Sequence, residues 1–132
     1  MPVRSLNSSI CRWPDAATVI AAARHWAENL TAHEPGVLAV GYFGSYARGQ
    51  AGVGSDLDLV VIIRDGSRGA DPRDQAWAVE MLPVPAERLV YSVSQWNDLR
   101  AGGGRFYRTL ACEARWLVGG PPPAPQGGTG TL

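Results

Sequence analysis

Residues 44–63 read GSYARGQAGVGSDLDLVVII, a glycine-rich segment that leads directly into an apolar run. Its first fifteen residues hold four glycines and two serines, and they end with Asp56 and Asp58, which stand one residue apart. The run from Leu57 to Ile63 predicts a buried strand because it is rich in β-branched residues. Alternate residues of a strand point to the same face, so the sequence predicts two neighbouring carboxylates at the start of a buried strand.

The residues before this stretch predict a helix and a strand. The helix would open at Trp13-Pro14-Asp15, with Pro14 at the first helical position, and run to about Ala32, where Pro35-Gly36 follows as a stop signal. Apolar residues at helical spacing predict the side that faces the core: Val19, Ala23, Trp26 and Leu30. A strand over 37–43 then leads into the glycine-rich turn.

The residues after Ile63 predict a loop followed by helices and short strands. We expect a polar loop over 64–74, a helix over 75–82, a strand over 87–93 and a helix over 95–100 with Ser94 as its N-cap. A helix over 105–115, with Phe106, Leu110 and Ala114 on one face, would precede a short strand over 116–118. These elements predict an α/β (α+β) fold, a small mixed sheet flanked by helices.

The composition predicts one domain over residues 14–118, after an irregular N-terminus over 1–13. Residues 119–132 are Gly, Pro and small polar residues, which predict a disordered tail. The net charge is zero, which gives no strong signal for nucleic acid, and no apolar run is long enough to span a membrane. We therefore expect a cytoplasmic protein, with Cys11 and Cys112 as reduced thiols.

All twelve basic residues are Arg, so the chain has no lysine for a P-loop or a Schiff base. The quoted stretch offers another way to bind phosphate. Two close carboxylates repel each other unless a cation lies between them, and oxygen ligands of this kind suit Mg²⁺. The hydroxyl of Ser45 and the N–H groups of a helical turn after Gly44 would form an anion site, with Arg48 and Arg64 as candidate phosphate contacts. The alternative is that the aspartates only solvate the end of a strand.

The segment GSYARG followed by SDLDLVV resembles the signature of the polymerase-β-like nucleotidyltransferase superfamily. Among its members, the chain looks most like the minimal nucleotidyltransferase domains of prokaryotes, over residues 14–118. The later segment ERLVYSVSQWNDLRAGGGRFYRTLACEARWLV is similar to the closing half of the family, where a strand carries a third carboxylate. The resemblance implies a polymerase-β-like fold.

The same resemblance implies roles for individual residues. Gly44 and Ser45 would hold the β- and γ-phosphates of a nucleoside triphosphate, and Arg48 and Ser55 would also bind the nucleotide. The predicted catalytic and metal-binding residues are Asp56, Asp58 and Glu87. The family more often has Asp at the third position, so a solvated Glu87 without a catalytic role stays open.

By this resemblance, the protein is a Mg²⁺- or Mn²⁺-dependent enzyme that transfers a nucleoside monophosphate, AMP from ATP, to a hydroxyl. The resemblance includes antitoxins that modify a HEPN-type toxin protein, which makes such a toxin, encoded nearby, the first candidate acceptor. Two alternatives remain: a small-molecule (aminoglycoside-like) nucleotidyltransferase, and an inactive module that binds a nucleotide or a partner. The sequence also leaves a homo-oligomer open.

Overall fold

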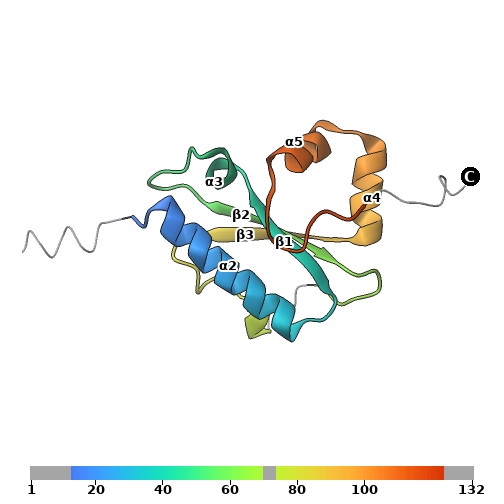
Figure 1. Cartoon of the computed structure of the whole chain (residues 1–132), viewed down its shortest axis with the longest axis horizontal. Coiled ribbons are helices and arrows are strands. Elements are labelled where there is room, and N and C mark those ends of the chain that lie inside the picture. The colour runs from blue at the N-terminus through green and yellow to red at the C-terminus, as the bar shows by residue number, and fades with distance from the viewer. Residues whose placement is uncertain (1–12, 70–73, 124–132) are drawn as a thin grey trace, which may run out of the picture.

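The computed structural model describes residues 13–69 and 74–123, in which helices pack on both faces of a four-stranded sheet (Figure 1). In chain order the described elements are α2 (Ala16–His33), β1 (Val37–Phe43), α3 (Ser45–Arg48), β2 (Leu57–Ile63), the 3-10 helix η1 (Gln75–Trp77), β3 (Ala86–Ser92), α4 (Val93–Gly102), α5 (Arg105–Glu113) and β4 (Arg115–Val118). The predicted mixed sheet flanked by helices is confirmed. No helix among these residues is both long enough and apolar enough to cross a membrane.

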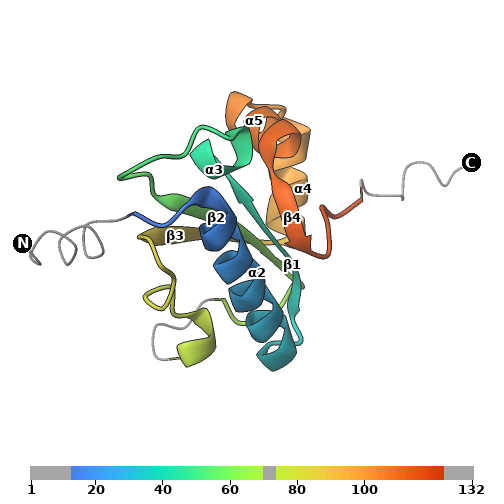
Figure 2. The same cartoon turned by 60° about the vertical axis from the view of Figure 1, so that its left-hand side comes forward.

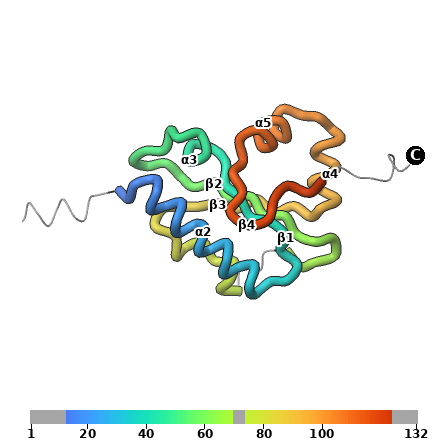
Figure 3. The backbone as a smooth tube through the Cα atoms, viewed as in Figure 1, coloured from blue at the N-terminus to red at the C-terminus, as the bar shows by residue number. Residues whose placement is uncertain are grey.

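The strands are arranged in the order β3-β2-β1-β4. β1 pairs antiparallel with β2 on one side and with β4 on the other, while β2 and β3 run parallel. Figure 3 shows β4 returning beside β1 at the end of the described chain. The sheet is therefore mixed, and β2, which begins directly after Asp56, is an inner strand.

Alternating residues of β1 and β2 separate two hydrophobic clusters. Leu57, Leu59 and Val61 pack with α2 in the larger cluster, which also includes Trp77 of η1. Val60 and Ile62 point the other way and pack with Trp96 of α4 and Leu110 of α5. The sheet thus has an α2 face and an α4–α5 face, which can be followed in Figure 2.

Trp96 connects α4 and α5 to the sheet. It is fully buried, and its ring lies 5.4–6.4 Å from those of Tyr91, Tyr107 and Trp116. Such aromatic contacts add to the free energy gained by burying the ring. They fix α5 above the sheet, which is where it borders the site described below.

The strands over 37–43 and 57–63 have the predicted bounds, and the predicted core residues of the first helix are all buried. That helix begins at Ala16, later than predicted, because Asp15 is its N-cap and accepts a hydrogen bond from the Thr18 N–H. The expectation that Pro14 lies in the first turn was wrong. Since Asp15 already satisfies a free N–H of the first turn, the preceding proline lies outside the helix.

Two predictions after Ile63 were also wrong. In place of the predicted helix over 75–82, the chain forms only the short 3-10 helix η1. Ala78 is already extended, and the chain then places Leu82 and Val84 in the core. Ser94 is not the N-cap of α4. The N-cap is Ser92, which forms a capping box with Gln95, so the helix begins at Val93, two residues earlier than predicted.

The later elements begin or end near the predicted residues. β3 covers Ala86–Ser92, α5 ends at Glu113, and β4 begins at Arg115. Of the predicted tail, only 119–123 are described, and there Arg100 donates a hydrogen bond to the carbonyl of Pro122. Residues 124–132, and residues 1–12 of the predicted irregular segment over 1–13, including Cys11, lie outside the described residues, whereas Cys112 is an exposed free thiol.

Candidate active site

The glycine-serine turn forms the first wall of the site. Gly44 is the N-cap of α3 and has φ +77° and ψ −152°, a backbone conformation that favours glycine. The N–H groups of Ala47 and Arg48 both donate to the carbonyl of Gly44, so the predicted helical turn after Gly44 is present. The N–H groups at the very start of a helical turn have no partner within the helix, and the one on Gly44 is bound by Glu113.

Asp56 and Asp58 lie beside this turn. Asp58 pairs with Phe43 across β1 and β2, and two residues further along its strand Val60 packs on the α4–α5 face. Asp58 therefore lies on the face that α5 covers. The structure brings both aspartates together with Gly44, Ser45 and Arg48 around one cavity of about 420 Å³.

α5 supplies the opposite wall, which the sequence analysis did not assign to the site. Its cavity-lining residues recur at helical spacing: Phe106, Thr109, Leu110 and Glu113. Phe106 is 44% exposed and makes an edge-to-face contact with Phe43 at 6.4 Å between ring centroids. The helical spacing was visible in the sequence, but nothing local indicated that this helix would lie over Asp58.

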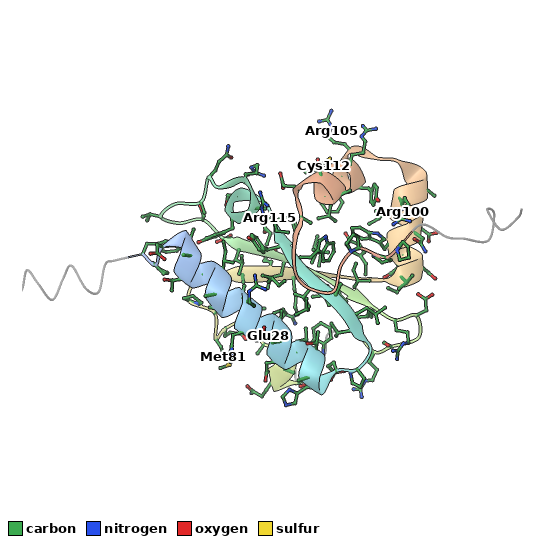
Figure 4. The ribbon with its side chains drawn as sticks, in the orientation of Figure 1. Glu28, Met81, Arg100, Arg105, Cys112 and Arg115 are labelled. Atoms are coloured by element: carbon green, nitrogen blue, oxygen red, sulfur yellow. The ribbon has the colours of Figure 1, made fainter. Side chains whose placement is uncertain are left out.

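Glu113 joins α5 to the turn. Its Oε1 accepts a hydrogen bond of 2.9 Å from the Gly44 N–H, and its Oε2 forms an ion pair of 3.0 Å with Arg48 Nη1. Two residues later Arg115, labelled in Figure 4, donates through Nε to the carbonyl of Ala47 at 3.1 Å. The end of α5 and the start of β4 thus hold α3 at two points.

Negative charge accumulates around Asp58. Burial raises the pKa of Asp58, and the nearby charges of Asp56, Glu87 and Glu113 raise it further, while Arg48 opposes the change. Burial would likewise raise the pKa of Glu113, but its hydrogen bonds from Arg48 and Gly44 outweigh this and lower it. A cation bound beside Asp58 would offset this repulsion between its carboxylate and the three neighbouring acids.

Three other predicted residues do not line the cavity: Glu87, Ser55 and Arg64. Glu87 is the register partner of Asp58 on β3, as expected of a neighbouring strand, but it is exposed and lies outside the cavity lining. Ser55 also lies outside the lining, where its hydroxyl accepts a hydrogen bond from the Gly52 N–H at 2.9 Å. Arg64 follows the opposite end of β2, roughly 20 Å from Asp58 at strand spacing, so its predicted contact with the phosphate site was wrong.

The sequence matches the family model of the nucleotidyltransferase domain over residues 24–98, more than half of the chain. The chain belongs to the nucleotidyltransferase domain family. The resemblance seen in GSYARG and SDLD is thereby confirmed at the level of the family, and the protein is a nucleotidyltransferase. The match includes the glycine-serine turn and both aspartates, but it ends before α5.

Comparison with solved structures finds one described as the crystal structure of a toxin-antitoxin with AMP-PNP. It is similar over 81% of this chain and 75% of its own, with 17% sequence identity and a TM-score of 0.44. No curated protein matches the sequence significantly.

Proposed function

We propose that this nucleotidyltransferase uses Mg²⁺ or Mn²⁺ to transfer a nucleoside monophosphate, AMP from ATP, to a hydroxyl acceptor. The observation that carries the proposal is the shared cavity. It joins an anion-binding turn at Gly44 and Ser45 to the two carboxylates of Asp56 and Asp58. A nucleotide with its cation needs both kinds of site next to each other.

The phosphate chain would bind at the turn. Ser45 contributes a hydroxyl and lies in the first turn of α3, and Arg48, at the end of that turn, contributes a guanidinium. Charge-assisted hydrogen bonds from such groups to phosphate oxygens are stronger than neutral ones. Ser55 would also bind the nucleotide, although in this structure its hydroxyl accepts a hydrogen bond from the Gly52 N–H.

The residues fit a divalent cation. Asp56 and Asp58 line one cavity, and the raised pKa of Asp58, caused first by burial and then by neighbouring acids, reflects excess negative charge that a cation would offset. Among residues 13–69 and 74–123 no three acidic, His or Cys side chains are already grouped to hold a metal. Two carboxylates are nevertheless sufficient for Mg²⁺, which keeps waters and takes further oxygens from substrate phosphates. When bound, the cation would neutralise charge on the triphosphate.

The nucleobase would contact Phe106. Ligand sites commonly combine aromatic side chains with a few polar groups, and the Phe106 ring is 44% exposed and lines this cavity. It touches Phe43, the cross-strand partner of Asp58, so it lies about one side chain away from the predicted cation site. An aromatic face accepts any nucleobase by stacking.

In the reaction, the acceptor hydroxyl would attack the α-phosphorus and displace pyrophosphate. Catalysis of this kind depends mainly on positioning and on electrostatic stabilisation. We propose Glu87 as the residue nearest in register to Asp58 that could accept the proton of the hydroxyl. For the acceptor we keep the hydroxyl of a HEPN-type toxin encoded nearby, which follows from the sequence resemblance alone.

Incubation with ATP labelled at either the α- or the γ-phosphorus tests this function. The purified chain, Mg²⁺ and the product of the neighbouring gene should give a labelled protein with α-labelled ATP and none with γ-labelled ATP, because only the AMP moves. Asp56→Asn should abolish labelling, whereas Asp98→Asn, an exposed aspartate on α4, should not. ATP binding without any transfer would favour the inactive binding module, and transfer to an aminoglycoside would favour the small-molecule enzyme.

A further inference from the structure

In this structure a carboxylate already binds the turn that the phosphate chain is proposed to use. Glu113 accepts the Gly44 N–H through one oxygen and pairs with Arg48 through the other. Gly44 and Arg48 belong to the turn, while Glu113 comes from α5, 69 and 65 residues away in sequence. The turn therefore has an anion bound to it, and that anion is part of the chain.

We propose that the Glu113 carboxylate is an internal ligand of the phosphate-binding turn, which the phosphate chain of a nucleotide must displace, so that Glu113 sets the affinity for nucleoside triphosphates. This inference rests on the proposed function, because it takes the turn to be the phosphate site. The Gly44 N–H carries one hydrogen and can make one good hydrogen bond, so a carboxylate and a phosphate oxygen compete for it. Arg48 has further N–H groups, and for this residue the competition concerns charge.

The charges that line the cavity also indicate that Glu113 competes with a phosphate chain. Three acids line it, namely Asp56, Asp58 and Glu113, and Arg48 is the basic residue in its lining. A triphosphate adds several negative charges, and each carboxylate that stays nearby repels it in a partly buried site. Asp56 and Asp58 can be offset by a cation, but Glu113 binds the turn itself. Removing only this charge should therefore strengthen phosphate binding.

Displacement of Glu113 requires no refolding of the site. α5 is held to the core by Leu110, which is fully buried, and α3 is also held by Arg115 through the carbonyl of Ala47. Rotation of one side chain would free the Gly44 N–H while both elements stay in place. Arg48 is 46% exposed at its side chain and can turn toward a new anion.

Calorimetry with Mg²⁺ and two probes, ATP and inorganic tripolyphosphate, tests this inference on the full chain. Glu113→Gln keeps an oxygen that can accept from Gly44 but loses the charge. We expect it to bind both probes about 3–10-fold more tightly than the wild type, since each shares the phosphate chain. Glu28→Gln, on the exposed side of α2 (labelled in Figure 4), changes the net charge equally and should leave both affinities unchanged.

Unchanged or weaker binding by Glu113→Gln, in a series where the wild type binds ATP, would overturn the inference and leave the proposed function standing. If neither protein binds either probe, both this inference and the proposed function are refuted. If Glu113→Gln does not fold, the wild type is measured by ¹³C NMR of the Glu113 carboxyl. Its signal should move as Mg²⁺–tripolyphosphate saturates the protein, and a signal that stays in place would refute displacement.

Discussion

A Cβ atom added to Gly44 would clash with Oδ2 of Asp58. Gly44 also has φ +77°, where any side chain is strained. The glycine of the turn and the second aspartate of the strand therefore depend on each other, although thirteen residues separate them in the sequence, from 45 to 57. The pairing of Phe43 with Asp58 brings the glycine-serine turn next to the carboxylates, and glycine at position 44 leaves room for the Asp58 carboxylate.

Replacing Gly44 should disable the site. Gly44→Ala forces either the turn or the Asp58 carboxylate to move, and we expect metal-dependent ATP binding to weaken at least about tenfold, because this is the cost of losing roughly one charge-assisted hydrogen bond. Gly49→Ala is the matched control, since Gly49 has φ +73° but nothing within 4 Å of an added Cβ. Calorimetry should show nearly normal binding for Gly49→Ala; equal losses in both variants would mean that backbone strain alone matters.

Neutralising Asp58 should stabilise the metal-free protein near neutral pH. Burial, then Asp56 and the other acids, raises the pKa of Asp58 in the folded state. The folded chain thus binds this proton more tightly than the unfolded chain, in which the pKa of an aspartate is about 3.9. The resulting destabilisation is absent below that value and grows to its full size as pH rises through the folded-state pKa. Asp58→Asn removes it.

Thermal unfolding of the two proteins without metal checks this sign. At pH 7 the Tm of Asp58→Asn should exceed that of the wild type by about 1–4 °C, and the difference should shrink toward pH 3. Adding Mg²⁺ should raise the Tm of the wild type more than that of the variant. A lower Tm for Asp58→Asn at pH 7 would contradict the electrostatic account of the site.

Loss of the Phe106 ring should weaken binding of the base and not of the phosphates. Stacking contributes about 1–3 kcal/mol per base, so Phe106→Ala should bind Mg²⁺–ATP about tenfold more weakly. Tripolyphosphate has no base, and its affinity should not change. Phe106→Tyr keeps the aromatic face and should bind both normally. Equal weakening for both ligands would indicate that Phe106 only supports α5.

The part of the site that lies within one continuous segment could be predicted from the sequence. Glycine, serine and the two aspartates are close along the chain, and the rules for a turn and for a strand place them without knowledge of the rest of the fold. The two strands around this segment also had their predicted bounds, because both are apolar and end at strong turn signals.

The wall formed by α5 could not be predicted in this way. Its position follows from the packing of Trp96 with Tyr107 and Trp116, which belong to separate elements and meet only in the folded chain. The role of Glu113 depends on that packing, since its partners Gly44 and Arg48 lie in the other half of the chain. The predicted helix over 75–82 failed for a related reason: burial of Leu82 and Val84 outweighed local helix propensity.

Glu87 offers a test of catalysis rather than binding. It lies beside Asp58 in the parallel pair of β2 and β3, and it is exposed, so a hydroxyl acceptor can reach it. Glu87→Gln keeps the size and the hydrogen-bonding capacity of the side chain but cannot accept a proton. AMP transfer should fall by about 10²–10⁴-fold, the usual contribution of a positioned general base, while the Kd for Mg²⁺–ATP changes little.

Glu80→Gln is the control for this variant, because Glu80 is exposed and lies outside the cavity lining. Single-turnover transfer of labelled AMP, measured across pH, separates the two possible roles of Glu87. A proton acceptor gives a rate that rises with pH in the wild type and loses that rise in Glu87→Gln. A residue that only helps to hold the cation would instead lose activity that higher Mg²⁺ restores, because its loss weakens binding of the metal. Wild-type rates in Glu87→Gln at every pH would show that β3 contributes no catalytic group and that the reaction proceeds with Asp56 and Asp58 alone.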